Sequence, residues 1–222
     1  IEIFEHADAL FERLATDIDA AVQRVHIEVY IALDDPTSAR VFAALERAAL
    51  RGLDCRLMLD GVGSRRFLQS DRPARLRAAG VSVVEALPVG IVRRRFGRID
   101  LRNHRKIVVI DRSIGYIGSH NLAAKDFKVK ERYAPWVDAT MRVSGAAVND
   151  LQKIFVEDWH LETDEQLWHL IGQGVHDGNS SAIAQVLGTG PATYESAMPQ
   201  LVLSIVHLAE DEVVLTTPYF VP

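Results

Sequence analysis

The residues best suited to do chemistry lie between His104 and Asn121, where the pattern H-x-K-x4-D-x6-G-S-x-N is matched at every fixed position. At average residue usage such a match arises by accident on the order of once in 10⁵ chains of this length. An imidazole can attack phosphorus and leave again, while an ammonium group and an amide offset charge on the phosphoryl oxygens. Gly118 and Ser119 allow backbone amides and a hydroxyl to approach an anion. The motif predicts a phosphate-handling site that needs no metal or other cofactor.

Strand geometry places the first two motif residues together. Side chains alternate between the faces of a strand, so His104 and Lys106 share one face and Arg105 lies on the other. The apolar run at 107–110 is typical of a strand buried on both faces. Asp111 has the opposite parity from His104, so a structural role at the strand end is an alternative to a catalytic one.

Other candidate residues carry a weaker signal. Glu28 lies on an apolar strand and can point either into the site or into solvent from an edge position. Cys55 is the single cysteine, which excludes an internal disulfide and a Cys-rich zinc site. No metal is predicted, because metal-ligand spacing is absent among the remaining histidines, which include His26, His120, His160, His169, His176 and His207.

The elements that must position the motif alternate between strand and helix patterns. This order predicts an α/β/α sandwich, in which helices cover a mixed or parallel sheet. The strands at 104–111 and 113–117 form a hairpin in this prediction, and 88–103 is a long loop. The predicted helices are 7–22, a segment from a cap at Thr37 or Ser38 to 50, a basic helix from 65 to about 80, 145–160 and 193–208. The other predicted strands are 25–31, 54–60, 81–84, 137–143, 184–187 and 213–217.

Composition limits the class of protein. The 222 residues are 48% hydrophobic and 25% charged, which suits a folded chain with a core. Apolar runs are too short to span a bilayer, and the acidic start is unlike a signal peptide. Ile1 in place of a start methionine predicts an excised or processed piece.

Charge is distributed unevenly along the chain. The net charge is -5, yet residues 65–106 hold twelve Lys and Arg against three acids, which leaves that stretch at +9 and the remainder at -14. A basic sector on an acidic protein favours an anionic partner such as a phospholipid surface or nucleic acid, although a solvated cationic face is an equal alternative.

The motif and its surroundings resemble the HKD phospholipase D superfamily, and more closely the bacterial cardiolipin synthases, over the whole chain. Residues 26–31, 51–64, 103–111, 135–138 and 158–159 look like successive segments of that family, and 217–222 resemble the opening of its second half. One departure is Gly118-Ser119, where these synthases often carry Gly-Gly. A second is that no other H-x-K-x4-D motif occurs here. The resemblance implies a first domain over 1–161, a connector over 162–181 and a truncated second domain over 182–222.

The resemblance also implies roles for the residues. One histidine attacks a phosphatidyl phosphorus to form phosphohistidine, and a second histidine protonates the leaving alcohol. By position His104 is one of this pair, Lys106 and Asn121 hold the phosphoryl oxygens, and Ser119 assists. Asp138 can accept the far ring proton of His104 and thereby select its tautomer, or it can be an exposed strand residue.

The implied reaction transfers a phosphatidyl group between two phosphatidylglycerol molecules, giving cardiolipin and glycerol at a bacterial inner membrane. The implied partners are anionic phospholipid, the membrane surface, and a missing C-terminal half with a second HKD motif, or less readily a second copy of the chain. A nuclease or phosphodiesterase and a non-catalytic module are the alternatives, and the acidic remainder of the chain disfavours nucleic acid. Residues 88–98, which interleave apolar side chains with arginines, are predicted to contact the membrane.

Overall fold

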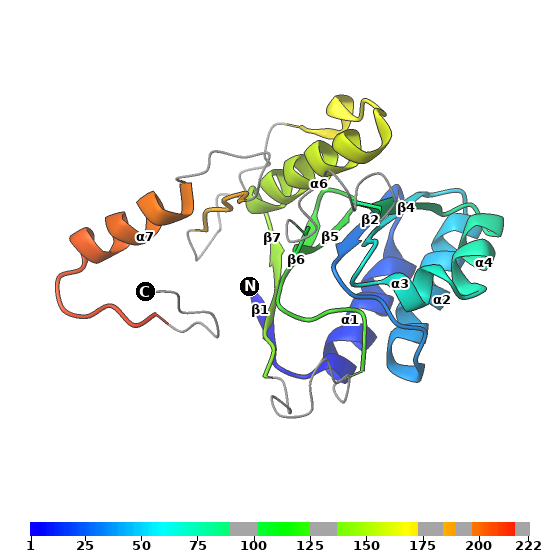
Figure 1. Cartoon of the computed structure of the whole chain (residues 1–222), viewed down its shortest axis with the longest axis horizontal. Coiled ribbons are helices and arrows are strands. Elements are labelled where there is room, and N and C mark those ends of the chain that lie inside the picture. Colours follow the sequence, from blue (N-terminus) through cyan, green and yellow to red (C-terminus); the bar gives the residue numbers. More distant parts are fainter. Residues whose placement is uncertain (89–101, 125–136, 173–183, 190–196, 216–222) are drawn as a thin grey trace, which may run out of the picture. The chain divides into compact units, whose positions relative to one another are not determined.

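The computed structural model describes residues 1–88, 102–124, 137–172, 184–189 and 197–215. The chain divides into two compact units, Ile1–Val186 and Leu187–Pro222. The first contains a seven-stranded sheet with its helices, and the second contains the helix α7 (Ala197–Leu208) (Figure 1). Within the described ranges, no helix is long and apolar enough to cross a membrane.

The sheet is mixed, with the strand order β1-β7-β6-β5-β2-β3-β4. β2, β3 and β4 run parallel to one another, whereas β5 is antiparallel to β2 and each strand from β5 to β1 is antiparallel to its neighbour. The predicted α/β class with a mixed sheet and flanking helices is therefore confirmed. The strands are β1 Glu2–Phe4, β2 Arg24–Val29, β3 Asp54–Asp60, β4 Ser82–Ala86, β5 Lys106–Ile110, β6 Ile114–Gly118 and β7 Thr140–Ser144.

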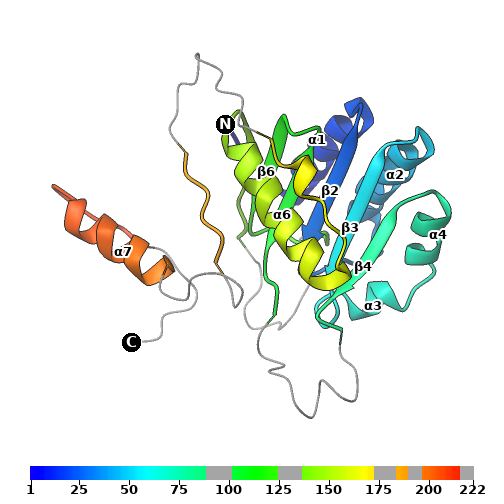
Figure 2. The ribbon, with the colours of Figure 1, turned by 90° about the horizontal axis from the view of Figure 1, so that it is seen from above.

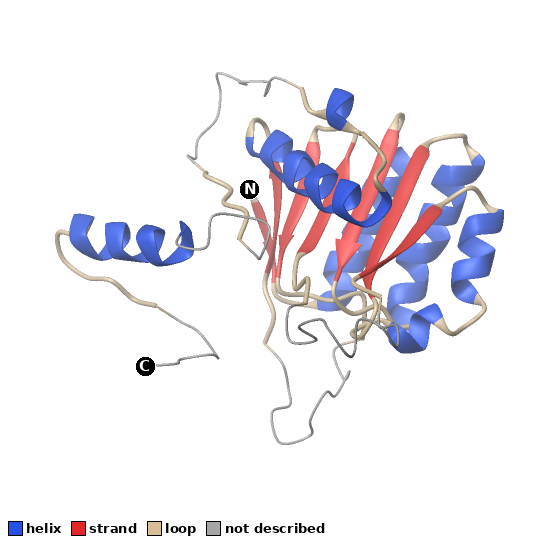
Figure 3. Cartoon of the chain, turned by 45° about the horizontal axis from the view of Figure 1, so that its top comes forward, coloured by secondary structure: helices blue, strands red, loops and turns tan. Residues whose placement is uncertain are grey.

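Helices cover both faces of this sheet. The long helix α6 lies across one face, and the helices that precede β4 cover the other, so the first unit has three layers (Figures 2 and 3). The helices are α1 Ala7–Ala20, α2 Pro36–Leu50, α3 Arg65–Leu68, α4 Arg72–Ala78, α6 Ala147–Thr163 and the short 3-10 helix η2 Trp168–Leu170.

Strand alternation separates the two apolar layers. In β2, Val25, Ile27 and Val29 join the core beneath α1 and α2. The intervening residues of the same strand face α6, where the His26 ring stacks on Phe155 with ring centroids 4.7 Å apart. β5 is buried on both faces as predicted, since alternate residues of 107–110 enter the two layers.

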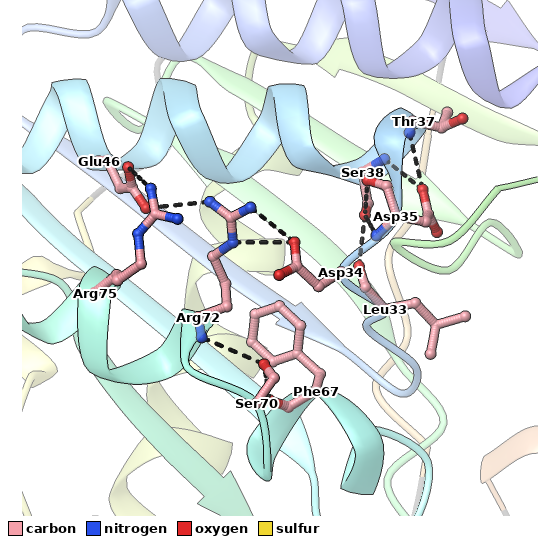
Figure 4. A network of polar contacts seen from close by, with 10 residues as sticks. All are labelled: Leu33, Asp34, Asp35, Thr37, Ser38, Glu46, Phe67, Ser70, Arg72 and Arg75. Atoms are coloured by element: carbon pink, nitrogen blue, oxygen red, sulfur yellow. Dashed lines mark hydrogen bonds and ion pairs between the residues drawn. The ribbon is translucent and has the colours of Figure 1, made fainter.

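The start of α2 differs from the prediction that Thr37 or Ser38 caps it. Pro36 occupies the first turn, so the cap is Asp35, whose side chain accepts hydrogen bonds from the backbone N–H of Thr37 and Ser38 (Figure 4). Nearby, Arg72 of α4 donates to Asp34 at 2.8 Å, which joins the two helical segments (Figure 4).

Other elements also depart from the sequence pattern. The predicted basic helix over 65–80 is two helices, α3 and α4, and α4 has Pro73 in its first turn. The short edge strand β1 was not predicted. The strands predicted at 184–187 and 213–217 are wrong for their described residues, which are not in strands. A strand requires a hydrogen-bonded neighbour, and none is seen for the described residues of these two segments.

The residues that follow α6 belong to the first unit and pack in its core. α6 runs to Thr163, so the domain boundary predicted at 161 lies inside this helix. Leu167 and Leu170 are buried against Phe155 and Trp159. The first residues of the predicted connector 162–181 are therefore part of the core layer beneath α6, and a second domain from 182 stays a prediction.

Candidate active site

The motif residues meet because of how the strands are ordered. β5 is antiparallel to β2, so its first residue, Lys106, pairs with Val29 at the end of β2. The end of β6 lies beside the start of β5, where Ile107 pairs with Ile117. Segments far apart in the sequence therefore meet at one end of the sheet (Figure 3).

His104 and Lys106 lie side by side at this end, as strand parity predicts. The Lys106 ammonium is 3.5 Å from His104 Nδ1 and donates to the His104 carbonyl oxygen at 2.6 Å. The Tyr30 ring packs against His104 with ring centroids 4.0 Å apart, and Lys106 Nζ lies 5.4 Å from the centre of the same ring. Tyr30 thus contacts both motif residues and limits where they can point.

The surroundings shift the protonation of both groups. Partial burial lowers the pKa of His104 below its ordinary value of 6.5, and the Lys106 charge lowers it further against the opposing effect of Asp60. Burial lowers the pKa of Lys106 to about 8, against the opposing charge of Asp138. At neutral pH this arrangement favours an uncharged imidazole beside an ammonium group.

Asn121 is held beside the end of β2. Its partner there is Ile31, the residue that follows Tyr30. Its Oδ1 accepts a hydrogen bond of 3.0 Å from the backbone N–H of Ile31. Backbone hydrogen bonds from Leu122 to Ile31 and from Leu33 to Leu122 fasten the same segment. Because the carbonyl end of the amide faces β2, its NH₂ group is the part suited to donate to a ligand.

Gly118 and Ser119 have structural partners that the sequence did not reveal. A Cβ on Gly118 would overlap the Ala139 carbonyl oxygen and Thr140 Cα, so a glycine is required where β6 and β7 approach closely. The Ser119 hydroxyl accepts from the Ala139 N–H at 3.0 Å, and the Ser119 N–H donates to the Ala139 carbonyl at 2.8 Å. Ser119 is nonetheless exposed, so its hydroxyl stays within reach of a ligand.

Asp138 acts on residues other than the one predicted. Burial lowers the pKa of Lys106 and of His120, and the Asp138 charge partly offsets this in both; the carboxylate that acts on His104 is Asp60. The described contacts include no hydrogen bond between Asp138 and His104. His120 itself is buried, and its Nδ1 is 3.0 Å from the Thr140 hydroxyl. The predicted tautomer-selecting contact within this chain is therefore not seen.

Asp111 lies at the opposite end of β5 from His104. Its two carboxylate oxygens accept three hydrogen bonds of 2.7–2.8 Å from the backbone N–H groups of Val22, Gln23 and Arg24, which lead into β2. Its backbone has a φ of 50°, a conformation that Asp tolerates better than most residues. These contacts support the structural alternative for Asp111, in which it ties the strand end, over the predicted catalytic role.

We expect Asp111→Ala to lower the free energy of unfolding by about 3 kcal/mol, because three hydrogen bonds to a carboxylate are lost. Asp111→Asn, which retains the Oδ1 acceptor and tolerates the same backbone, should lose less. Urea denaturation measures both changes. A catalytic Asp111 would instead lower the turnover of the folded Asp111→Asn protein and leave its stability unchanged.

Glu28 occupies neither of its predicted positions. It lies on the central strand β2 and is only 3% exposed, so it is not an edge residue in solvent. It faces α6, whereas Lys106 shares the opposite face with Val29. Its Oε1 accepts a hydrogen bond from Asn103, the residue before His104. Glu28 therefore lies beneath the site, and among the described residues its hydrogen bond to the motif region is with Asn103.

Several residues at this end of the sheet were not selected from the sequence. Tyr30 contacts both His104 and Lys106. Asp60 is buried, caps the turn after β3 through the N–H groups of Val62 and Gly63, and pairs with Arg102 at 2.9 Å. The sequence signal for these residues is their position, because each lies near the end of a predicted strand or close to the motif. Among the described residues no group of three or more His, Cys, Asp or Glu side chains could hold a metal ion.

Comparisons with known proteins identify the family of this chain. The family described as "Cardiolipin synthase, PLD-like domain" matches residues 14–159. Cardiolipin synthase A of Proteus mirabilis (strain HI4320) is 36% identical over 230 residues, and that of Edwardsiella ictaluri (strain 93-146) is 35% identical over 226 residues. Each alignment covers 100% of this chain and 46% of the relative, so the chain spans about half the length of these curated relatives.

Solved structures support the fold alone. The phospholipase D family member Nuc from Salmonella typhimurium matches with a TM-score of 0.52 and 14% identity, over 74% of this chain and 98% of that one. NucT from Helicobacter pylori matches with a TM-score of 0.53 and 14% identity, over 72% and 94%. The matched family and the relatives together show that this chain belongs to the cardiolipin synthase family of phospholipase D-like proteins.

Proposed function

We propose that this chain supplies one half of the active site of a cardiolipin synthase-type phosphatidyltransferase. The observation that carries the proposal is the His104–Lys106 pair, with 3.5 Å between Nζ and Nδ1, at the open end of the sheet. A phosphoryl group placed there meets a nucleophile and a cation together. The membership of the chain in the cardiolipin synthase family supports phosphatidylglycerol as the substrate.

In the first step a ring nitrogen of His104 forms a bond to the phosphatidyl phosphorus. The bond from phosphorus to the glycerol headgroup breaks, and its electron pair leaves on the alcohol oxygen, which takes a proton from an acid. The lowered pKa of His104 supports the role of nucleophile, because only the neutral ring can attack. Lys106 and the Asn121 amide would offset the charge on the phosphoryl oxygens, with Ser119 and the Gly118 backbone at the rim.

In the second step a hydroxyl of another phosphatidylglycerol attacks the phosphohistidine. Its proton passes to the group that acted as the acid, and His104 is released, so cardiolipin and glycerol are the products. We propose that the acid is a second histidine supplied from outside these 222 residues, which contain a single H-x-K-x4-D motif. A C-terminal half with its own motif fits the doubled length of the relatives, and a second copy of this chain is the alternative.

The substrate implies work at a membrane surface. Part of the predicted basic sector is unsuited to this role, because Arg72, Arg102 and Arg105 are paired with acids of the protein. Arg65 and Arg66 of α3 are exposed and remain candidates for contact with anionic headgroups. The predicted membrane segment 88–98 lies outside the described residues, apart from Pro88.

The test is product formation by the full-length gene product that contains this chain. We expect vesicles of phosphatidylglycerol to yield cardiolipin and glycerol in equal amounts, measured by mass spectrometry and an enzymatic glycerol assay. EDTA should leave the rate unchanged within about twofold, because imidazole, ammonium and amide groups supply the stabilisation.

Plasmid DNA serves as the competing substrate in the same assay. Cleavage of the plasmid without any lipid product would contradict the proposal in favour of a nuclease. A loss of turnover in EDTA that one equivalent of a divalent ion restores would contradict the metal-free mechanism. Free phosphatidic acid with little cardiolipin would identify water as the preferred acceptor and the protein as a phospholipase.

A further inference from the structure

Two buried acids lie beneath the proposed active site on the α6 side of the sheet. Glu28 of β2 is 3% exposed and Asp158 of α6 is 7% exposed. They come from different layers, and neither takes part in the proposed chemistry. Burying two carboxylates together is costly unless each is hydrogen-bonded or paired, so their partners indicate what the pair does.

The partners are the residues on either side of His104. The Asn103 amide donates to Glu28 Oε1 and, at 3.2 Å, to Asp158 Oδ2. The Arg105 guanidinium pairs with the same Asp158 oxygen. The Arg105 backbone N–H also donates to Asn103 Oδ1 at 3.1 Å, which closes the short turn around His104.

His104 needs such support because the sheet does not hold its backbone. The β5 ladder begins at Lys106, opposite Val29, so the residues before it lack strand partners. Asn103 and Arg105 reach through to the α6 layer, while His104 lies exposed on the other side against Tyr30. Contacts of Asn103 and Arg105 thus hold the chain on both sides of His104, whose ring has to face the substrate.

We propose that Glu28 and Asp158 are positioning residues that hold Asn103 and Arg105, and through them set the direction of the His104 ring. This inference rests on the proposed role of His104 in phosphoryl transfer. A reacting nitrogen displaced by about 1 Å loses up to about 10²-fold in rate, so the pair would control turnover without touching the substrate.

The charge of the cluster is consistent with this role. Burial, followed by the Asp158 charge, raises the pKa of Glu28 well above its ordinary value. The Arg105 guanidinium, which pairs with Asp158, opposes this rise. The strand neighbours of Glu28, Met58 on β3 and Ile107 on β5, are apolar.

A purely structural role, in which the acids only join α6 to β2, is the competing explanation. The chain offers a matched control in Gln152 of α6, whose Nε2 is 3.1 Å from Nδ1 of His26 on β2. This contact is fully buried and joins the same two elements on the same face of the sheet. It reaches none of the residues 103–105, so it reports the effect of a lost α6–β2 link alone.

The experiment compares Glu28→Leu, Glu28→Gln and Gln152→Leu in the full-length protein. We expect Glu28→Leu to lower kcat by about 10–100-fold with KM for phosphatidylglycerol within about twofold. Glu28→Gln, which keeps one acceptor for Asn103 and one donor for Asp158, should retain activity within about threefold. Gln152→Leu should lower the melting temperature by a similar amount to Glu28→Leu, with kcat nearly unchanged.

A second readout does not depend on activity. The His104 and Tyr30 rings are in contact, with centroids 4.0 Å apart, so the His104 ring protons should carry a ring-current shift in the NMR spectrum, with Tyr30→Leu as the reference without that ring. Glu28→Leu should move these resonances toward the Tyr30→Leu positions, whereas Glu28→Gln and Gln152→Leu should not. Unmoved resonances in Glu28→Leu, or equal losses of kcat in Glu28→Leu and Gln152→Leu, would overturn the inference. If the wild-type protein makes no cardiolipin, the proposed function fails, and the NMR comparison still decides whether Glu28 positions His104.

Discussion

Replacing His104 by alanine in the full-length protein is expected to lower cardiolipin formation by a factor on the order of 10⁴ or more, close to complete loss. Such a factor corresponds to about 5 kcal/mol of transition-state stabilisation. The reason is that the proposed reaction passes through a bond between the imidazole and phosphorus, and alanine offers no substitute. Stability should change by less than about 1 kcal/mol, because His104 is exposed and its side chain packs chiefly on Tyr30.

Two further variants make this expectation specific. Lys106→Met keeps the length of the side chain and removes its charge, so it should also inactivate while the protein stays folded. His169→Ala, at an exposed histidine on the 3-10 helix η2, serves as the matched control and should keep full activity. Isotope-labelled phosphatidylglycerol should leave a covalent adduct on the peptide that contains His104 in the wild type only. Undiminished turnover by a folded His104→Ala protein would contradict the proposed mechanism.

The second large effect is expected when this chain is separated from its proposed complementary half. A chain with one imidazole can attack phosphorus, but the leaving alcohol then departs without its acid. General acid catalysis is typically worth 10²–10⁴-fold, which corresponds to roughly 3–5 kcal/mol. We therefore expect the 222-residue chain alone to turn over at least about 10²-fold more slowly than an equimolar mixture with a separately expressed C-terminal half.

The control for this experiment is a C-terminal half in which the histidine of its own motif is replaced by alanine. This half should bind without restoring the rate, which separates chemistry from simple stabilisation. Analytical ultracentrifugation of the chain alone shows whether it pairs with itself. Full activity of a monomeric chain would contradict the half-site proposal, and activity that appears only in a dimer would favour the homodimer alternative.

The alternation of side chains along the sequence was sufficient to predict that His104 and Lys106 lie together. Parity placed His104 and Lys106 on one face because a strand repeats every two residues, whatever it packs against. The apolar run after them indicated a central strand, and β5 is buried on both faces. The alternation of strand and helix patterns likewise predicted a layered α/β fold. The prediction was wrong where an element depends on a distant partner, as at 184–187 and 213–215.

Contacts between distant segments could not be read from such patterns. Asp111 was left between a catalytic and a structural role, because nothing local shows that the Val22–Arg24 backbone lies opposite it. Glu28 was placed in the site or in solvent, because its partners Asn103 and Asp158 are 75 and more than 100 residues away. The register that brings them together depends on the strand order of the whole sheet.

The amino-acid sequence is enough to identify the chemical groups: an imidazole and an ammonium two residues apart where a buried strand begins, with a nearby amide, in a chain of the cardiolipin synthase family. The surroundings of these groups follow from the fold as a whole. It placed Tyr30 against His104 and the acids Glu28 and Asp158 beneath it. The physical reason is that side-chain periodicity is a property of each strand or helix alone. The pairing of strands and the burial of charged groups are settled by all the layers packing at once.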